Sequence, residues 1–125
     1  MYSLLLLRTA GRPADILHVA ADSAKYGYDI EDRSAGGPTY IEVKGSAGTD
    51  FRFFITLNER DAAKRLGKKY LLHFWGGLDL TSDMQAEYTR LRSDGYPLVI
   101  DNPEAEFETD HVDIRPSEWS VVVKG

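Results

Sequence analysis

The sequence predicts a single α+β or α/β domain built around a mixed β-sheet. Strand-like segments precede, separate and follow two helix-like segments, which is the order expected when helices pack on a mixed sheet. Glycine and proline turns divide these segments, and no repeat or low-complexity linker interrupts them. The 125 residues are 42% hydrophobic, enough to bury one core. We therefore expect one domain over residues 1–125.

Two strands are expected near the N-terminus. The apolar segment Tyr2–Arg8 predicts the first, and it ends before the Gly11–Pro13 breaker. The segment Ile16–Ala20 predicts the second, although Pro13 could instead open a helix that ends at Gly27. The strand is the preferred interpretation.

A β-hairpin is predicted from Tyr26–Asp32 and Thr39–Gly45, because the turn residues Gly36, Gly37 and Pro38 separate them. In the second strand Ile41 and Val43 alternate with charged residues, so the two kinds occupy opposite faces. A turn centred between Ala35 and Gly36 would place Asp29 opposite Glu42.

The remaining elements follow from capping signals and apolar runs. Thr56 and Glu59 have capping-box spacing and predict a helix that Gly67 ends, and Ser82 and Gln85 repeat that spacing before a second helix ending near Gly95. Met84, Tyr88 and Leu91 are expected on the buried face of the second helix. Further strands are predicted at Phe51–Leu57, Lys68–Trp75, 96–100, 111–114 and 120–123.

Composition narrows the possible functions. The chain has no cysteine, which excludes disulfides and thiolate metal sites and is compatible with the cytoplasm. No apolar run is long enough to cross a membrane. The net charge of -5 is unlike that of a typical nucleic-acid binder, yet residues 25–75 carry nine Lys and Arg against seven acids, and residues 76–125 carry four against eleven.

Three charged residues of the predicted hairpin form a candidate site. Asp29 and Glu42 would provide carboxylate oxygens, which hard divalent cations such as Mg²⁺ prefer, and Lys44 lies two residues beyond Glu42 on the same face. Such a lysine can hold a water and offset charge at a phosphorus atom. Glu-x-Lys is also common on solvated strand faces, so the residues alone leave both interpretations open.

The motifs around this site resemble a known family. "GYDI" at 27–30, "YIEVKG" at 40–45, "FFITLNE" at 53–59, "AAKRLG" at 62–67 and "KKYLLHF" at 68–74 resemble the NO VEIN C-terminal-domain family over Ile16–Trp75. That family is regarded as a divergent member of the PD-(D/E)xK nuclease superfamily. The resemblance implies a restriction-endonuclease-like mixed sheet flanked by helices, with a motif core over about 16–75 and a C-terminal extension over 76–125.

The resemblance also implies roles for individual residues. Asp29 and Glu42 match the metal-binding acids, for Mg²⁺ or alternatively Mn²⁺, and Lys44 matches the catalytic lysine. Superfamily members usually carry a helix with a further acid before the first strand, and Asp15 or Asp22 could supply that acid. Thr56, Asn58 and Glu59 match a family "T-x-N-E" signature, which helix capping also explains.

The expected function is a Mg²⁺-dependent endonuclease, a hydrolase acting on nucleic acid with DNA as the preferred substrate, in a restriction or defence system. The alternative is a catalytically inactive module of the same fold that binds nucleic acid or a protein. The basic residues expected to contact phosphates are Arg60, Lys64, Arg65 and Lys68. A homodimer is expected through the uncovered edge of a strand at Tyr2–Leu7.

Histidines and aromatic residues receive structural roles. The three histidines have no metal-ligand spacing and are expected in the core or on the surface: His18, His73 and His111. The aromatic residues expected to pack the core are Phe51, Phe53, Phe54, Phe74 and Trp75.

Overall fold

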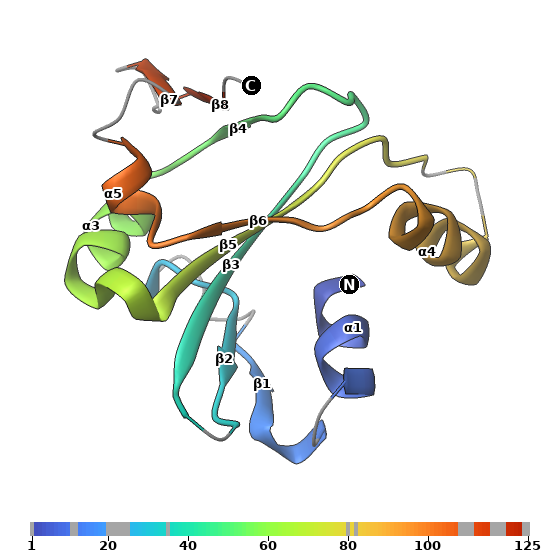
Figure 1. Ribbon diagram of the computed structural model, residues 1–125, viewed down its shortest axis with the longest axis horizontal. Coiled ribbons are helices and arrows are strands. Elements are labelled where there is room, and N and C mark those ends of the chain that lie inside the picture. The colour runs from blue at the N-terminus through green and yellow to red at the C-terminus, as the bar shows by residue number, and fades with distance from the viewer. Residues whose placement is uncertain are drawn as a thin grey trace.

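The computed structural model describes residues 2–10, 13–19, 26–34, 36–79, 81, 83–107, 112–115 and 120–123. A five-stranded sheet has the order β1 (Ile16–His18), β2 (Ile30–Asp32), β3 (Thr39–Gly45), β5 (Tyr70–Trp75) and β6 (Leu98–Asp101) (Figure 1). A second sheet has the order β4 (Arg52–Phe54), β8 (Ser120–Val123) and β7 (Val112–Arg115). Strands β3 and β5 are parallel and the other pairs are antiparallel. The predicted α+β class with a mixed sheet is therefore confirmed.

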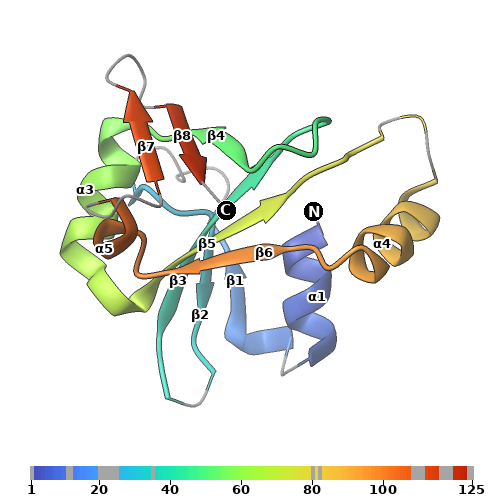
Figure 2. The same cartoon turned by 45° about the horizontal axis from the view of Figure 1, so that its top comes forward.

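Four α-helices accompany the sheets within the described residues. They are α1 (Tyr2–Ala10), α3 (Leu57–Leu66), α4 (Met84–Ser93) and α5 (Pro103–Phe107), and short 3₁₀ turns cover Pro13–Asp15 and Gly67–Lys69. Two views place α3 and α5 together near the start of β5, and α1 and α4 on the other side of the molecule (Figures 1 and 2). Helix α3 lies between β3 and β5 in the chain, so it forms part of the crossover that two parallel strands require.

The predicted hairpin and its register are confirmed. Strands β2 and β3 pair with Ile30 opposite Ile41 and Asp32 opposite Thr39. The pairing ends at Ile30, so the predicted Asp29–Glu42 pair is not part of it, and the Asp29 amide instead donates to the Ile41 carbonyl. The preference of Ile16–Ala20 for a strand is also confirmed by β1, although Ala20 lies outside the described residues.

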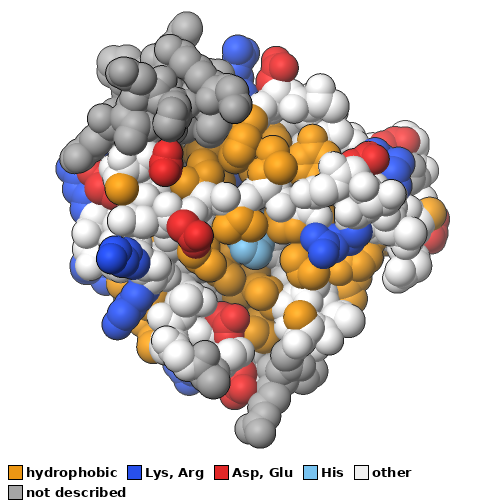
Figure 3. Space-filling model, in the orientation of Figure 1, with side chains coloured by type: hydrophobic (Ala, Val, Ile, Leu, Met, Phe, Trp, Pro, Cys, Tyr) orange, Lys and Arg blue, Asp and Glu red, His pale blue; other side chains and the backbone are white. Residues whose placement is uncertain are grey.

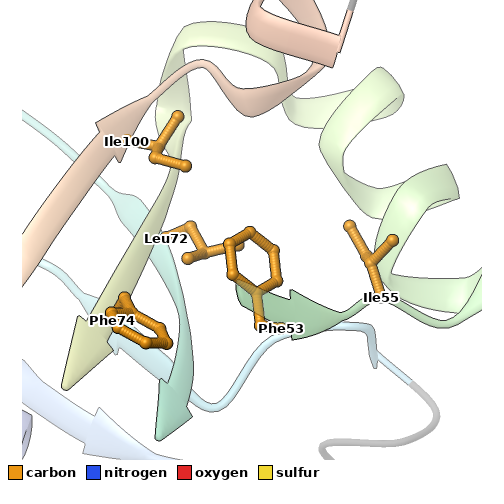
Figure 4. Close-up of a cluster of buried hydrophobic side chains, with 5 residues drawn as sticks. All are labelled: Phe53, Ile55, Leu72, Phe74 and Ile100. Carbon is orange, nitrogen blue, oxygen red and sulfur yellow. The ribbon is translucent and has the colours of Figure 1, made fainter. Parts of the chain in front are cut away.

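Three buried clusters hold the described elements together. Phe53 and Ile55 meet Leu72, Phe74 and Ile100 between β4 and the main sheet (Figure 4). A second cluster lies under α1 and contains Leu4, Ile16, Ile30 and Ile41. The third joins α3 to the sheet and contains Tyr28, Ala62, Ala63 and Tyr70. The site strand β3 therefore has apolar packing on both of its faces.

The predicted strand at Tyr2–Arg8 is wrong, because these residues form helix α1. The run of four leucines has no alternation, and the helix turns Ser3 and Leu4 into the protein. The Ser3 hydroxyl lies 3.0 Å from His73 Nδ1 and accepts a hydrogen bond from Trp75 Nε1 at 2.7 Å. The homodimer stays a prediction, but without the strand edge on which it was based.

Other differences concern the second helix and the aromatic residues. Helix α4 begins after Asp83, whose carboxylate accepts a hydrogen bond from Ala86 N, whereas Ser82 lies outside the described residues. Met84 is 63% exposed, and Glu87 joins Leu91 on the buried face instead. The expected core position of Phe54 is wrong, since its side chain is 58% exposed. Helix α5 was not predicted.

The distribution of side chains on the surface and the lengths of the helices give two further observations. Apolar side chains gather over the middle of the face seen in Figure 3, and Lys and Arg side chains lie mostly toward its margins. None of the helices within the described ranges is both long and apolar enough to span a membrane.

Candidate functional site

A pocket of about 500 Å³ brings the main predicted site residues together. Its lining comes from the hairpin and from the start of α3: Asp29, Glu42, Val43, Lys44, Thr56, Asn58 and Glu59. The three residues expected to perform chemistry thus share one pocket with the three residues of the family signature.

The hairpin fixes Asp29 against β3. The Asp29 amide donates to the Ile41 carbonyl at 2.9 Å, and Asp29 Oδ2 accepts from the Val43 amide at 2.9 Å. This second bond occurs one residue beyond the paired part of β2, where a side chain replaces the backbone as acceptor. It holds the carboxylate between Glu42 and Lys44 along β3.

Glu42 occupies an unusual environment for a carboxylate. The residue is only 4% exposed, and its Oε2 has no hydrogen-bond partner among the described residues. The pKa of Glu42 is raised to about 10, mainly by burial and also by the nearby carboxylates of Glu59 and Asp29, while Lys44 acts in the opposite direction. The site therefore favours either a proton on Glu42 or an added cation beside it.

Lys44 is held by the helix cap. Lys44 Nζ lies 2.7 Å from Glu59 Oε1, and both side chains are largely buried. The same oxygen accepts the Thr56 amide at 2.8 Å, while Thr56 Oγ1 accepts the Glu59 amide at 3.2 Å. The predicted capping box is confirmed. The ion pair between Glu59 and Lys44 was not predicted, because the capping pattern gives no information on which strand faces the helix.

A glycine allows the segment before Asp29 to approach α3. Gly27 has φ +80°, and a Cβ there would lie 2.6 Å from the Asn58 carbonyl oxygen and 2.8 Å from Ala62 Cβ. Only glycine fits both the backbone conformation and the space. The "GYDI" segment thus packs against the first turns of the helix that carries Glu59.

Tyr70 of β5 hydrogen-bonds to the same segment, and the sequence did not predict it as a site residue. Its hydroxyl donates to the Gly27 carbonyl at 2.7 Å. Burial raises the pKa of Tyr70, and the carboxylates of Glu42, Glu59 and Asp29 raise it further, so the phenol stays a neutral donor. The only sequence signal is a tyrosine at the start of an apolar strand.

The four predicted phosphate contacts do not line this pocket. Arg60 is partly buried and its Nε lies 3.8 Å from Glu104 Oε2 on α5. Lys64, Arg65 and Lys68 are exposed farther along α3 and in the following turn. Asp15 also lies outside the lining, and Asp22 falls outside the described residues.

The donor set fits a hard divalent cation. Asp29 and Glu42 supply carboxylate oxygens, and Oε2 of Glu42 is buried with no partner among the described residues. Three carboxylates and one lysine line the pocket. Within the described ranges no group of three His, Cys, Asp or Glu side chains forms a metal-ligand set. Mg²⁺ is commonly held by one or two carboxylates with water and substrate oxygens, so these two residues satisfy its requirement.

Comparison with known proteins gives one match. The family described as "Protein NO VEIN, C-terminal" matches residues 2–75, which is more than half of the chain and includes α1 and the whole hairpin. Neither the curated proteins nor the solved structures gave a match. From the length of this match, which contains every residue that lines the site pocket, the chain belongs to the NO VEIN C-terminal domain family.

Proposed function

We propose that this domain is a Mg²⁺-dependent nuclease that hydrolyses phosphodiester bonds, with DNA as the preferred substrate. One observation carries the proposal: Asp29, Glu42 and Lys44 line one pocket, and a buried carboxylate oxygen of Glu42 has no hydrogen-bond partner in the part of the chain that the structure describes. The order of these residues, an acid on one strand and Glu-x-Lys on the next, is the pattern of the PD-(D/E)xK superfamily. We extend the proposal to membership of that superfamily.

In this mechanism Asp29 and Glu42 would hold Mg²⁺. When bound, the ion would act as a Lewis acid on the phosphoryl group and make a metal-bound water more acidic. Lys44 uses one of its three donor positions on Glu59, which leaves two for a water or a phosphate oxygen. Its charge would offset the negative charge that develops at phosphorus.

The direct experiment compares purified wild type with Lys44→Ala and Glu42→Ala on single- and double-stranded DNA and RNA in Mg²⁺ or Mn²⁺. Lys44→Ala should lower the cleavage rate by about a hundredfold or more and still bind the metal, because the lysine is not a ligand. Glu42→Ala should lose both metal binding and cleavage. Lys69→Ala is the matched control, since Lys69 is exposed outside the pocket. Equal cleavage by wild type and Lys44→Ala would contradict the assignment.

A second candidate is a catalytically inactive module that binds nucleic acid. The pairing of Lys44 with Glu59 favours it, because a buried ion pair can keep this lysine away from substrate. The net charge of -5 also limits general attraction to polyanions. Binding of an oligonucleotide with no cleavage in either metal would support this candidate and contradict the nuclease.

Cellular context is part of the proposal. We place the domain in the cytoplasm, which the lack of cysteine suits, and in a restriction or defence system. A homodimer is retained as the proposed assembly, and a monomeric mass by light scattering at micromolar concentration would contradict it.

A further inference from the structure

A second pocket adjoins the candidate site and involves residues that have no role so far. It also has a volume of about 500 Å³, and its lining runs from the end of β3 through the following loop to β4. Lys44 belongs to the lining of both pockets, so the two pockets are adjacent. A molecule bound at Lys44 can therefore extend into the second pocket.

One wall of the second pocket combines a cation and an aromatic ring. Arg52 and Phe54 lie two residues apart on β4, so both side chains leave the strand on the same side. Phe53 between them points the other way into the core cluster (Figure 4). Arg52 is exposed and Phe54 is 58% exposed. A single exposed phenylalanine is ordinary, but this one shares a pocket with a cation and Lys44.

The loop between β3 and β4 forms a small-residue part of the lining. The Gly48 carbonyl accepts the Gly77 amide at 2.8 Å, and the Ser46 carbonyl accepts the Leu78 amide at 3.0 Å. These bonds tie the loop to the segment after β5. A Cβ at Gly45 would lie 2.9 Å from Leu78 Cδ1, whereas one at Gly48 would meet only Ser46 Oγ at 3.6 Å. Gly48 N donates to Ser46 Oγ at 3.1 Å.

The pocket lining carries charges of both signs. Asp50 belongs to the lining and would repel a phosphate. Arg52 and Lys44 also belong to it and would attract one, so the lining has more cations than acids. The ring of Phe54 offers an apolar face in the same lining, which suits a planar base.

We propose that the second pocket is a nucleotide subsite for single-stranded nucleic acid, in which a base stacks on Phe54 and a neighbouring phosphate binds Arg52. The inference rests on the proposed function, because the subsite adjoins the proposed position of the scissile phosphate at Lys44. A duplex hides the faces of its bases, so only an unpaired nucleotide can use the ring. The pocket volume lies within the range typical of small-ligand sites.

The test measures binding separately from cleavage. A fluorescently labelled ten-nucleotide oligo(dT) is titrated with the full chain in EDTA, and anisotropy gives Kd. Phe54→Ala should weaken binding about tenfold, whereas Phe54→Trp should restore it, because stacking tolerates any aromatic ring. Arg52→Gln should weaken binding several-fold and make Kd less dependent on salt. A blunt duplex of the same length should show no dependence on Phe54.

Matched controls use exposed residues outside both pockets. Leu57→Ala removes an apolar side chain that is 61% exposed, and Arg33→Gln removes an exposed cation in the hairpin turn. Both should leave Kd within about twofold of wild type, as expected of surface changes. Unfolding temperatures of all variants should match.

Several outcomes would overturn the subsite. They are the absence of oligo(dT) binding by wild type, unchanged Kd for Phe54→Ala, and equal loss for Phe54→Ala and Leu57→Ala. If the wild type cleaves nucleic acid but Phe54→Ala changes neither cleavage nor Kd, the nuclease proposal stands and the subsite is excluded. Phe54-dependent binding without cleavage in any metal would remove the nuclease and retain the subsite.

Discussion

At the scale of single residues, Glu42 is the most costly feature of the site. Its carboxylate is buried beside two others, and only one ammonium group compensates them. A buried carboxylate without sufficient positive charge destabilises the folded state in its ionised form. A metal-binding role gives this cost a physical reason, because the ion would supply the missing charge.

The first prediction concerns the stability of Glu42→Gln without metal. The folded-state pKa of Glu42 is about 10 and its ordinary value is 4.5, so the stability that its protonation contributes is fully present below pH 4.5 and is lost as pH rises toward 10. Each pH unit costs about 1.4 kcal/mol. The neutral amide should therefore raise the free energy of unfolding by about 3 kcal/mol at pH 7 and by little at pH 4.5.

Urea unfolding in EDTA at both pH values measures this difference. Adding Mg²⁺ at pH 7 should stabilise wild type and leave Glu42→Gln unchanged, since a ligand stabilises only the state that binds it. A variant less stable than wild type at pH 7 would contradict the cost assigned to Glu42.

At the scale of elements, α3 and β3 act as one unit. Glu59 closes the capping box of α3 and binds Lys44 of β3 through the same oxygen. Gly27 permits the close approach of the strand that carries Asp29. A displacement of α3 would therefore affect Lys44, through its ion pair with Glu59, and Asp29, through the segment that packs on the helix at Gly27.

The second prediction separates capping from lysine positioning. Glu59→Ala and Thr56→Ala should each lower the free energy of unfolding by about 1 kcal/mol, the usual value of a cap. Glu59→Gln should lose less stability, because its amide oxygen can still accept the Thr56 amide. Glu59→Ala should free Lys44, and Glu59→Gln should weaken its attachment because the negative charge is lost, whereas Thr56→Ala should do neither.

Acetylation of Lys44 followed by mass spectrometry reports this release directly. We expect faster acetylation in Glu59→Ala and Glu59→Gln, and the wild-type rate in Thr56→Ala. Equal rates in all four proteins would show that Glu59 does not position the lysine.

Several elements could be predicted because their signals are local. The turn at Gly36–Pro38 predicted the hairpin register, and Asp29 and Glu42 at the end of this hairpin line one pocket. Capping spacing located α3. Helix α1 was missed because its leucine run fits either period, and only tertiary packing on β5 decides between them. The Lys44–Glu59 ion pair likewise depends on how the crossover packs, which no local pattern encodes.

At the scale of the whole molecule, two buried groups respond to pH in opposite directions. Burial lowers the pKa of His73 to about 4, from an ordinary 6.5, while Glu42 is shifted upward. The neutral histidine contributes stability above pH 6.5, and this contribution is lost as pH falls from 6.5 toward 4. Over the same interval the contribution of Glu42 grows.

The third prediction follows from this opposition. Without metal, the free energy of unfolding should be nearly constant between about pH 4.5 and 6.5 and should fall above pH 6.5, where only Glu42 contributes a slope. Replacing His73 with Gln should remove the plateau, because stability would then decline from pH 4.5 upward. Urea unfolding across this range checks both curves, and a wild-type maximum above pH 7.5 in EDTA would contradict the account.

The contacts of α1 with β5 bear on whether the matched segment can be inserted into other proteins. The rings of Tyr2 and Trp75, the residues at the two limits of the family match, lie with their centroids 5.5 Å apart. A unit whose two ends are adjacent can be inserted into a loop of a host protein without stretching that loop. The site lies wholly within this unit, and its last strand offers an edge that β6 covers here and that a strand of a host could cover instead. The candidate site is thus contained in a segment whose two ends lie side by side.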